Sequence, residues 1–144
     1  MEQKYSDLIN KAISASENSY SPYSGFRVGA ALLARNGKIY TGCNIENSSY
    51  SLTICAERTA FFKAISDDCT EFEAIAVVGS SDRNFSVPCT PCGACLQVMT
   101  EFCEPDFMII LSDGEHRFSE FLPNQFNKEK LLKDTGILNA NLDE

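Results

Sequence analysis

Apolar residues near the start of the chain recur at the three- and four-residue spacing of a helix. They are Tyr5, Leu8, Ile9, Ala12, Ile13 and Ala15. This spacing predicts an amphipathic helix over residues 5–19, ended by the turn-forming residues 21–25. Two further helices are predicted over residues 55–66, with Thr53 as the N-cap, and over residues 92–102.

Four segments have the pattern of β-strands. Residues 26–33 and 38–43 are predicted to form a hairpin, because Asn36-Gly37 between them is a strong two-residue turn signal. Residues 72–78 and 107–111 are short, almost continuous apolar runs, as expected of central strands covered on both faces. A helix lies between these two runs, and the order strand, helix, strand favours a parallel pair.

The remaining segments are less regular. Residues 44–54 are polar and predict a loop, while residues 120–122 and 128–133 predict short helices. The pattern as a whole indicates a mixed sheet that opens with a hairpin and is flanked by helices. With no linker, repeat or low-complexity segment, residues 1–144 are expected to form a single domain.

Charge and hydropathy narrow the function classes. The formal net charge is −8 and the sequence has no basic stripe, which argues against a nucleic-acid binder and favours a small, nearly neutral substrate. No apolar run approaches the roughly 20 residues of a membrane helix, and the first residues lack the pattern of a secretory signal. A cytoplasmic location is therefore expected.

Six of the seven cysteines fall into two groups, and Cys55 stands apart from both. An odd number without any sign of export argues against a disulfide framework. Cys43, Cys69 and Cys103 are scattered and are expected to be small buried apolar residues. Three others crowd into the segment 89–95, whose sequence is CTPCGAC. In a reducing compartment, such crowding indicates metal or redox chemistry.

The strongest signal is Cys55-Ala56-Glu57 followed by Pro91-Cys92-Gly-Ala-Cys95. Cys92 and Cys95 are three residues apart, so at the start of a helix they share a face and can bind one metal ion. Cys55 opens the other predicted helix. Both helix N-termini would direct partial positive charge at the thiolates and lower their pKa values.

Glu57 lies two residues after Cys55 and cannot share its helical face. We therefore expect it to be a proton carrier rather than a metal ligand. Three thiolates leave the fourth zinc position open, where water becomes hydroxide near neutral pH. Arg58 is a candidate for offsetting the charge of the cluster; its alternative is an exposed surface arginine.

Two other interpretations use the same cysteines. Cys89 could complete a saturated four-cysteine structural zinc site with Cys55, Cys92 and Cys95. Cys92 and Cys95 could also form a redox pair. Coordination by histidine is hard to build, because the single histidine, His116, lies outside both motifs and is expected to be an ordinary surface side chain. A base deaminase uses a three-cysteine zinc site together with a glutamate that does not bind the metal, and this pattern favours that class.

Four segments in the same order are similar to the signatures of the small cytidine deaminase family. They are YSPYSGFRVGAALL at 20–33, GCNIENSSYSLTICAERTA at 42–60, TPCGAC at 90–95 and LPNQF at 122–126. The resemblance covers nearly the whole chain. It implies a three-layer α-β-α fold with a central mixed five-stranded sheet, a homotetramer with sites at subunit interfaces, and hydrolytic deamination of cytidine and deoxycytidine in pyrimidine salvage.

The resemblance also implies roles for individual residues. Cys55, Cys92 and Cys95 would ligate one Zn²⁺ per chain, and Glu57 would shuttle protons. The implied substrate contacts are Phe26 on the pyrimidine, Asn44 and Glu46 on the ribose 3′-hydroxyl, the backbone N–H of Ala56 at the base or hydroxide, and Tyr50 and Phe126 near a neighbouring subunit's site.

One departure concerns the residue after the second cysteine of the PCxxC motif. The family commonly carries arginine there, whereas this chain has Leu96. Without that cation we expect more of the charge compensation to fall to Arg58, or the activity to be lower.

The alternatives to cytidine deamination are deamination of another aminated nucleoside and a non-catalytic zinc protein. Glu46 would repel a phosphate, which favours an unphosphorylated sugar.

Overall fold

The computed structural model describes residues 1–135; residues 136–144 of the expected single domain lie outside this range. In chain order the elements are α1 (Gln3–Ser16), β1 (Arg27–Ala34), β2 (Ile39–Cys43), the 3₁₀-helix η1 (Tyr50–Leu52), α2 (Ala56–Ser66), β3 (Phe72–Ser80), α3 (Gly93–Phe102), β4 (Met108–Leu111), β5 (Gly114–Arg117), α4 (Phe118–Phe121) and α5 (Lys128–Thr135). Every predicted helix and strand is present, and no bound differs from the prediction by more than three residues.

Within residues 1–135, five strands form one mixed sheet in the order β2-β1-β3-β4-β5. β1 pairs antiparallel with both β2 and β3, and β4 pairs antiparallel with β5. β3 and β4 are parallel and are joined through α3, as the order of elements predicted. The hairpin turn is also confirmed: Gly37 has a φ of 89°, and its N–H donates to the carbonyl of Ala34 at 3.0 Å.

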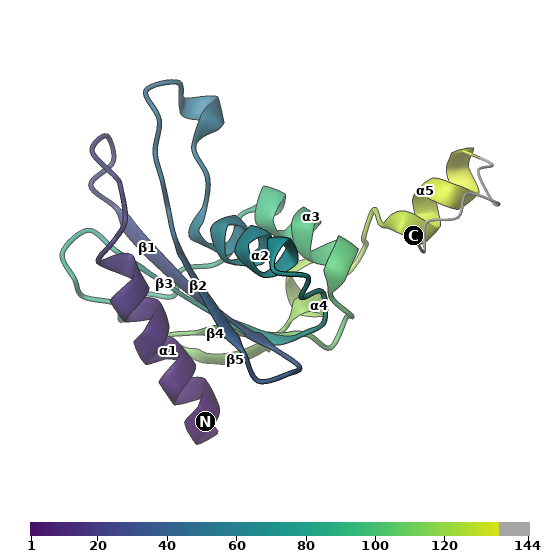
Figure 1. The fold of residues 1–144 in the computed structure, drawn as a ribbon, viewed down its shortest axis with the longest axis horizontal. Helices are drawn as coiled ribbons and strands as arrows, with labels where there is room; N and C mark the ends of the chain where they lie inside the picture. Colours follow the sequence, from purple (N-terminus) through teal and green to yellow (C-terminus); the bar gives the residue numbers. More distant parts are fainter. Residues whose placement is uncertain (136–144) are drawn as a thin grey trace.

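Both faces of the sheet are covered by helices, and this gives the three layers (Figure 1). Along β3, Ala74, Ala76 and Val78 pack in one core with Leu8 and Ala12 of α1. The alternate side chains of β3 face a second core that includes residues of α2 and α3. The prediction of a central strand buried on both faces is therefore correct.

Among the scattered cysteines, Cys69 is in this second core, Cys103 packs against it, and Cys43 is half-buried on β2.

Two predicted helix ends are wrong. The first helix stops at Ser16 rather than at residue 19, because the N–H groups of residues 17–19 donate three residues back instead of four and the Ser16 hydroxyl bonds to the carbonyl of Ile13. The N-cap of α2 is Cys55, not Thr53. The Thr53 hydroxyl instead accepts the backbone N–H of Asn47 at 3.2 Å, inside the loop.

The loop over residues 44–54 is more ordered than its polarity suggested. It contains η1, and a single antiparallel bridge joins Ile45 to Ile54. Near the C-terminus, α4 begins two residues before the predicted segment 120–122. α5 includes the predicted segment 128–133 and extends away from the sheet (Figure 1). No helix within residues 1–135 is long and apolar enough to cross a membrane.

Candidate active site

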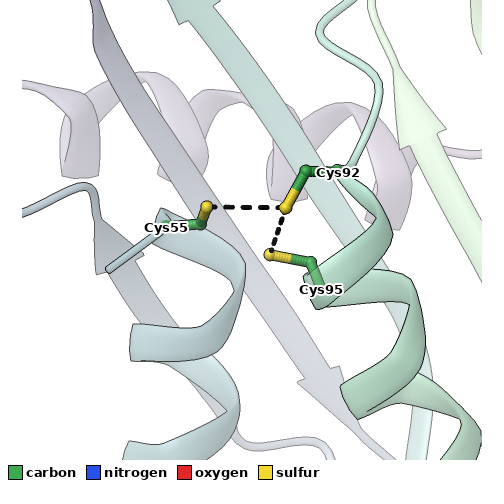
Figure 2. Close-up of side chains that lie close together, drawn as sticks. All are labelled: Cys55, Cys92 and Cys95. Atoms are coloured by element: carbon green, nitrogen blue, oxygen red, sulfur yellow. Dashed lines mark hydrogen bonds between the residues drawn. The ribbon is translucent and has the colours of Figure 1, made fainter. Parts of the chain in front are cut away.

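Three thiols converge where the N-termini of α2 and α3 meet (Figure 2). Cys55 is the N-cap of α2, Cys92 is the N-cap of α3, and Cys95 lies in the first turn of α3. The Sγ of Cys92 lies 3.7 Å from that of Cys55 and 3.6 Å from that of Cys95. The predicted cluster therefore forms at two helix starts, where backbone N–H groups direct partial positive charge at the sulfurs.

Close packing of β2 against α2 fixes the position of Cys55. A Cβ atom on Gly42 would lie 2.4 Å from the carbonyl oxygen of Ala56 and 2.6 Å from the nitrogen of Ala60. Only glycine therefore lets the strand approach the first turns of this helix. The helix start is held against the end of β2, and the Cys55 carbonyl accepts the N–H of Thr59 at 3.1 Å.

The spacing of the sulfurs fits a tetrahedral zinc ion. Two sulfurs bound about 2.3 Å from such an ion lie about 3.8 Å apart, close to the 3.6 and 3.7 Å found here. All three sulfurs lie within 4.8 Å of one another, and this three-thiol group is the metal-ligating cluster found among the described residues. Cys89 is not part of it. The geometry therefore supports three ligands and an open fourth position, rather than a saturated four-cysteine site.

Arg58 lies beside the cluster and not on the exposed surface. Its Nη2 donates to the Sγ of Cys55 at 3.3 Å, and the residue is half-buried. Hydrogen bonds from Cys95 and then Arg58 lower the pKa of the Cys55 thiol to about 5, although burial opposes the shift. The Nε of Arg58 is a buried donor without a hydrogen-bond partner among the described residues. A positively charged guanidinium in this position would offset the negative charge of the three thiolates in a metal site.

Glu57 is buried next to the thiols, with 4% of its surface exposed. It lies in the first turn of α2 but outside the group of ligating atoms, as the two-residue spacing from Cys55 predicted. Burial is the main cause that raises the pKa of this carboxyl, and the negative charge of Cys55 adds to the shift. The site therefore places an acid beside the metal cluster without using it as a ligand.

Hydrogen bonds fix the side chains of Asn44 and Glu46. Asn44 bonds to the start of β1, and Glu46 bonds to the turn that precedes this strand. The Asn44 side chain accepts from the N–H of Val28 at 2.9 Å and from the Ser19 hydroxyl, and donates to the carbonyl of Phe26 at 2.8 Å. Asn44 is therefore a buried structural residue as well as a candidate contact.

The Glu46 carboxylate accepts the backbone N–H groups of Tyr23 at 3.0 Å and Ser24 at 3.1 Å, together with the Ser24 hydroxyl. These bonds, the Ser24 hydroxyl first, lower the pKa of Glu46, so that it stays ionised. Sequence reasoning missed Ser19 and Ser24, because a serine in a turn carries no pattern that identifies its partner.

The aromatic candidates lie in different places. Glu46 and Tyr50 line one cavity of about 360 Å³, and the Tyr50 ring meets Tyr23 edge to face at 5.8 Å. Phe26 lines a second cavity, of about 300 Å³, with Cys89. Phe126 lines a third, against α3, where its carbonyl accepts the Gln97 side chain at 2.7 Å. Within the described part of the chain, Phe126 is thus not brought to the cavity of Glu46 and Tyr50.

Comparison with known proteins identifies the family. Residues 2–111 match the model of the cytidine and deoxycytidylate deaminase zinc-binding region. A cytidine deaminase from Sporosarcina psychrophila is 50% identical over 129 residues, which cover 86% of this chain and 92% of that protein. One from Halalkalibacterium halodurans is 49% identical over 129 residues, covering 86% and 95%.

A solved structure agrees with these sequence matches. The crystal structure of cytidine deaminase from Burkholderia pseudomallei superposes with a TM-score of 0.76 at 43% identity, covering 88% of this chain and 100% of that one. The fold, the zinc-binding region and the three-thiol cluster all agree with this likeness. The chain therefore belongs to the family of zinc-dependent cytidine and deoxycytidylate deaminases.

Proposed function

We propose that this protein hydrolyses cytidine and deoxycytidine to uridine and deoxyuridine, with release of ammonia. The observation that carries the proposal is the buried acid Glu57 beside three converging thiols and outside their ligand set. A structural zinc site has no use for such an acid. The relatives that share about half of their aligned residues with this chain are cytidine deaminases, which supports the same substrate.

Cys55, Cys92 and Cys95 would hold one Zn²⁺ per chain. When bound, the zinc supplies the reaction with a water acidified to hydroxide near neutral pH and offsets the negative charge that develops on the substrate. Arg58 stabilises the thiolate of Cys55 through its hydrogen bond, so that this ligand is deprotonated and ready for the metal.

Glu57 carries the protons of the reaction. It takes the proton that the nucleophilic water releases and delivers it to N3 of the base, which makes C4 electrophilic. After hydroxide adds to C4, Glu57 moves the hydroxyl proton to the amino group, the C4–N bond breaks and ammonia leaves. One residue thus performs general acid and general base catalysis in turn.

The hydrogen-bonding capacity of Asn44 and Glu46 suits a free ribose hydroxyl. Both acceptor sites on the Asn44 oxygen and one of its two amide hydrogens are used, so one donor remains. The ionised Glu46 can only accept. A 3′-hydroxyl accepts from Asn44 and donates to Glu46, whereas a phosphate has no proton to give and is repelled. We therefore propose nucleosides, not nucleotides, as substrates.

Two further contacts complete the proposed binding of the base. Phe26 is 40% exposed at the entrance to β1 and can present its ring to the flat pyrimidine. Ala56 is the first residue of α2, so its N–H has no partner within the helix and can bind the base or the hydroxide.

The assembly is part of the proposal. Tyr50 is 73% exposed and Phe126 is 51% exposed, and we assign both to sites shared with neighbouring subunits in a homotetramer. Residues 1–144 would act as one domain, and the cellular role would be pyrimidine salvage in the cytoplasm. The exposure of these two rings supports the assembly, because aromatic side chains are enriched where subunits meet.

The test is turnover of cytidine by wild type and by Glu57→Gln, with zinc measured in both proteins. Wild type should consume cytidine and release ammonia with one zinc per chain. Glu57→Gln keeps the volume of the side chain but cannot carry a proton, so we expect kcat to fall by at least about 10² to 10⁴ while zinc is retained.

Glu115→Gln is the matched control, because Glu115 is exposed on β5 and should leave kcat unchanged. An active Glu57→Gln variant would overturn the proton-transfer role. A zinc-loaded wild type that turns over neither cytidine nor deoxycytidine would overturn the proposed substrate.

A further inference from the structure

Gly79, near the end of β3, lies under the ring of Phe26. In the β1–β3 pairing Gly79 is opposite Val28, two residues after Phe26. A Cβ atom on Gly79 would lie 2.7 Å from Cε1 and 2.9 Å from Cζ of Phe26. Carbon atoms in favourable contact are about 3.5–4.0 Å apart. The Phe26 ring therefore occupies the space that any side chain at residue 79 would need.

A second group shares this space. The Sγ of Cys89 also lies 2.7 Å from the position of a Cβ on Gly79. The ring edge of Phe26 and the thiol of Cys89 therefore meet over the glycine, and all three residues line the same cavity of about 300 Å³. Cys89 packs against the same hydrophobic core as Cys55, and Cys95 is part of that core.

The obstruction at Gly79 differs in kind from that at Gly42. At Gly42 an added methyl group meets the backbone of α2, which cannot move without displacing the helix. At Gly79 the nearest atoms are the far ends of two side chains. A methyl group there can be accommodated by moving the ring and the thiol, so that the fold survives while the position of Phe26 changes.

We propose that Gly79 is a positioning residue: its missing side chain forms the seat that holds the Phe26 ring toward the pyrimidine, and Cys89 closes the wall of that seat. The inference rests on the proposed function, because it assigns the Phe26 ring to the base. To restore normal contact distances, a methyl group at residue 79 must push the ring away by about 1 Å. The stacking energy between the Phe26 ring and the pyrimidine falls steeply with such a displacement.

The experiment is a double-mutant cycle on zinc-loaded protein with wild type, Gly79→Ala, Phe26→Ala and the double variant. We expect Gly79→Ala to raise KM for cytidine by about three- to tenfold, with kcat within about twofold of wild type. Zinc content and melting temperature should stay near the wild-type values. In the Phe26→Ala background, the same glycine change should alter KM by less than about twofold, because the ring it displaces is absent.

An unchanged KM in Gly79→Ala would overturn the proposal, and so would an equal rise of KM in the Phe26→Ala background. If Gly79→Ala does not fold, Cys89→Leu is the second test. It puts a larger side chain next to the Phe26 ring from the loop between β3 and α3 and leaves β3 unaltered. It should raise KM only when Phe26 is present, and a rise that is independent of Phe26 would contradict the inference. Failure of the proposed function is distinguishable, since wild type would then be inactive.

Discussion

At the scale of single residues, the charge balance of the thiol cluster depends on Arg58. Leu96 stands where the family commonly has arginine, and it is 8% exposed within the core shared by α2 and α3. A core leucine cannot bring a cation to the sulfurs. Arg58 donates directly to Cys55 at 3.3 Å. The positions of Leu96 and Arg58 are thus consistent with the expectation that Arg58 offsets more of the negative charge of the thiolates.

We expect Arg58→Gln to release zinc at higher pH than wild type does. The Arg58 hydrogen bond helps to lower the pKa of the Cys55 thiol to about 5. Without it the folded-state pKa rises, so protons displace the metal at a higher pH. The midpoint of zinc release in a pH titration, read with a fluorescent chelator, should move upward by about half to one pH unit.

Arg83→Gln removes a guanidinium of the same size from an exposed ion pair with Glu17. It should leave the release midpoint in place. Equal midpoints for Arg58→Gln and wild type would mean that the guanidinium does not tune the ligand.

Residue-scale features differed in how far they could be predicted. The pairing of Cys92 with Cys95 and the position of Glu57 outside the ligand group were predictable from helical spacing, whereas the addition of Cys55 came from the deaminase motif, because it lies on another helix. The roles of Gly79 and Cys89 were not predictable. Whether a glycine leaves space for a ring depends on Phe26, which is far away in sequence and meets Gly79 only after β1 and β3 pair.

At the scale of elements, β5 and α4 are joined by the single histidine. His116 lies on β5, and its Nε2 pairs with Asp113 at 2.8 Å while its Nδ1 lies 3.5 Å from Glu120 of α4. The ring also stacks obliquely on Phe121 at 5.4 Å. The prediction of an ordinary surface side chain was therefore incomplete, because His116 connects an edge strand to the next helix.

The ion pairs of His116 should stabilise the protein most at low pH. The hydrogen bond to Asp113 is the main cause that raises the pKa of His116 above its ordinary 6.5. The stabilisation is therefore fully present below pH 6.5 and disappears as the pH rises through the folded-state value. The loss of melting temperature in His116→Asn should be larger at pH 6 than at pH 8.5.

Zinc is kept in excess in both buffers, so that loss of the metal does not enter the comparison. Glu115→Gln, on the same strand, should change the melting temperature equally at the two pH values. A pH-independent effect of His116→Asn would show that its packing on Phe121 matters and its charge does not.

The strength of the local pattern decided which elements were predictable. The hairpin carries strong turn residues, α1 has apolar side chains at helical spacing, and β3 is an almost continuous apolar run. β5 has the sequence Gly-Glu-His-Arg, with no apolar side chain, and forms because its backbone pairs with β4 at the edge of the sheet. The pattern gave no sign of it, although the family resemblance implied a fifth strand. The wrong N-cap of α2 has a similar origin, since a conventional capping residue stood two positions before the one the fold uses.

At the scale of the whole molecule, large apolar side chains remain exposed. They include Tyr50, Leu52 and Val87, each more than 60% exposed. Exposed aromatic side chains such as Tyr50 are enriched where subunits meet, which agrees with the proposed assembly. In Figure 1, the loop that carries η1 projects beyond the sheet, where a neighbouring chain can reach it.

The proposed homotetramer predicts that sedimentation equilibrium gives about four times the 15.9 kDa mass of one chain. Leu52→Asp places a charge on the exposed apolar surface and should shift the distribution toward smaller species, because an unpaired charge is costly to bury at an interface. Asp113→Asn, an exposed change on the β4–β5 turn, serves as the control and should keep the larger particle. A wild-type mass of one chain would contradict the proposed assembly.

The thiol cluster joins parts of the chain that are synthesised at different times. Cys55 precedes Cys92 by 37 positions, and the whole of β3 lies between them. A nascent chain that has emerged only as far as α2 therefore offers one of the three ligand thiols, too few to retain zinc against the cell's other chelators. Metal acquisition must wait until α3 has left the ribosome and settled on the sheet. The complete set of three ligands thus exists only once β3 and α3 have joined α2 in the fold, so zinc binding is expected to follow the folding of these elements rather than to start it.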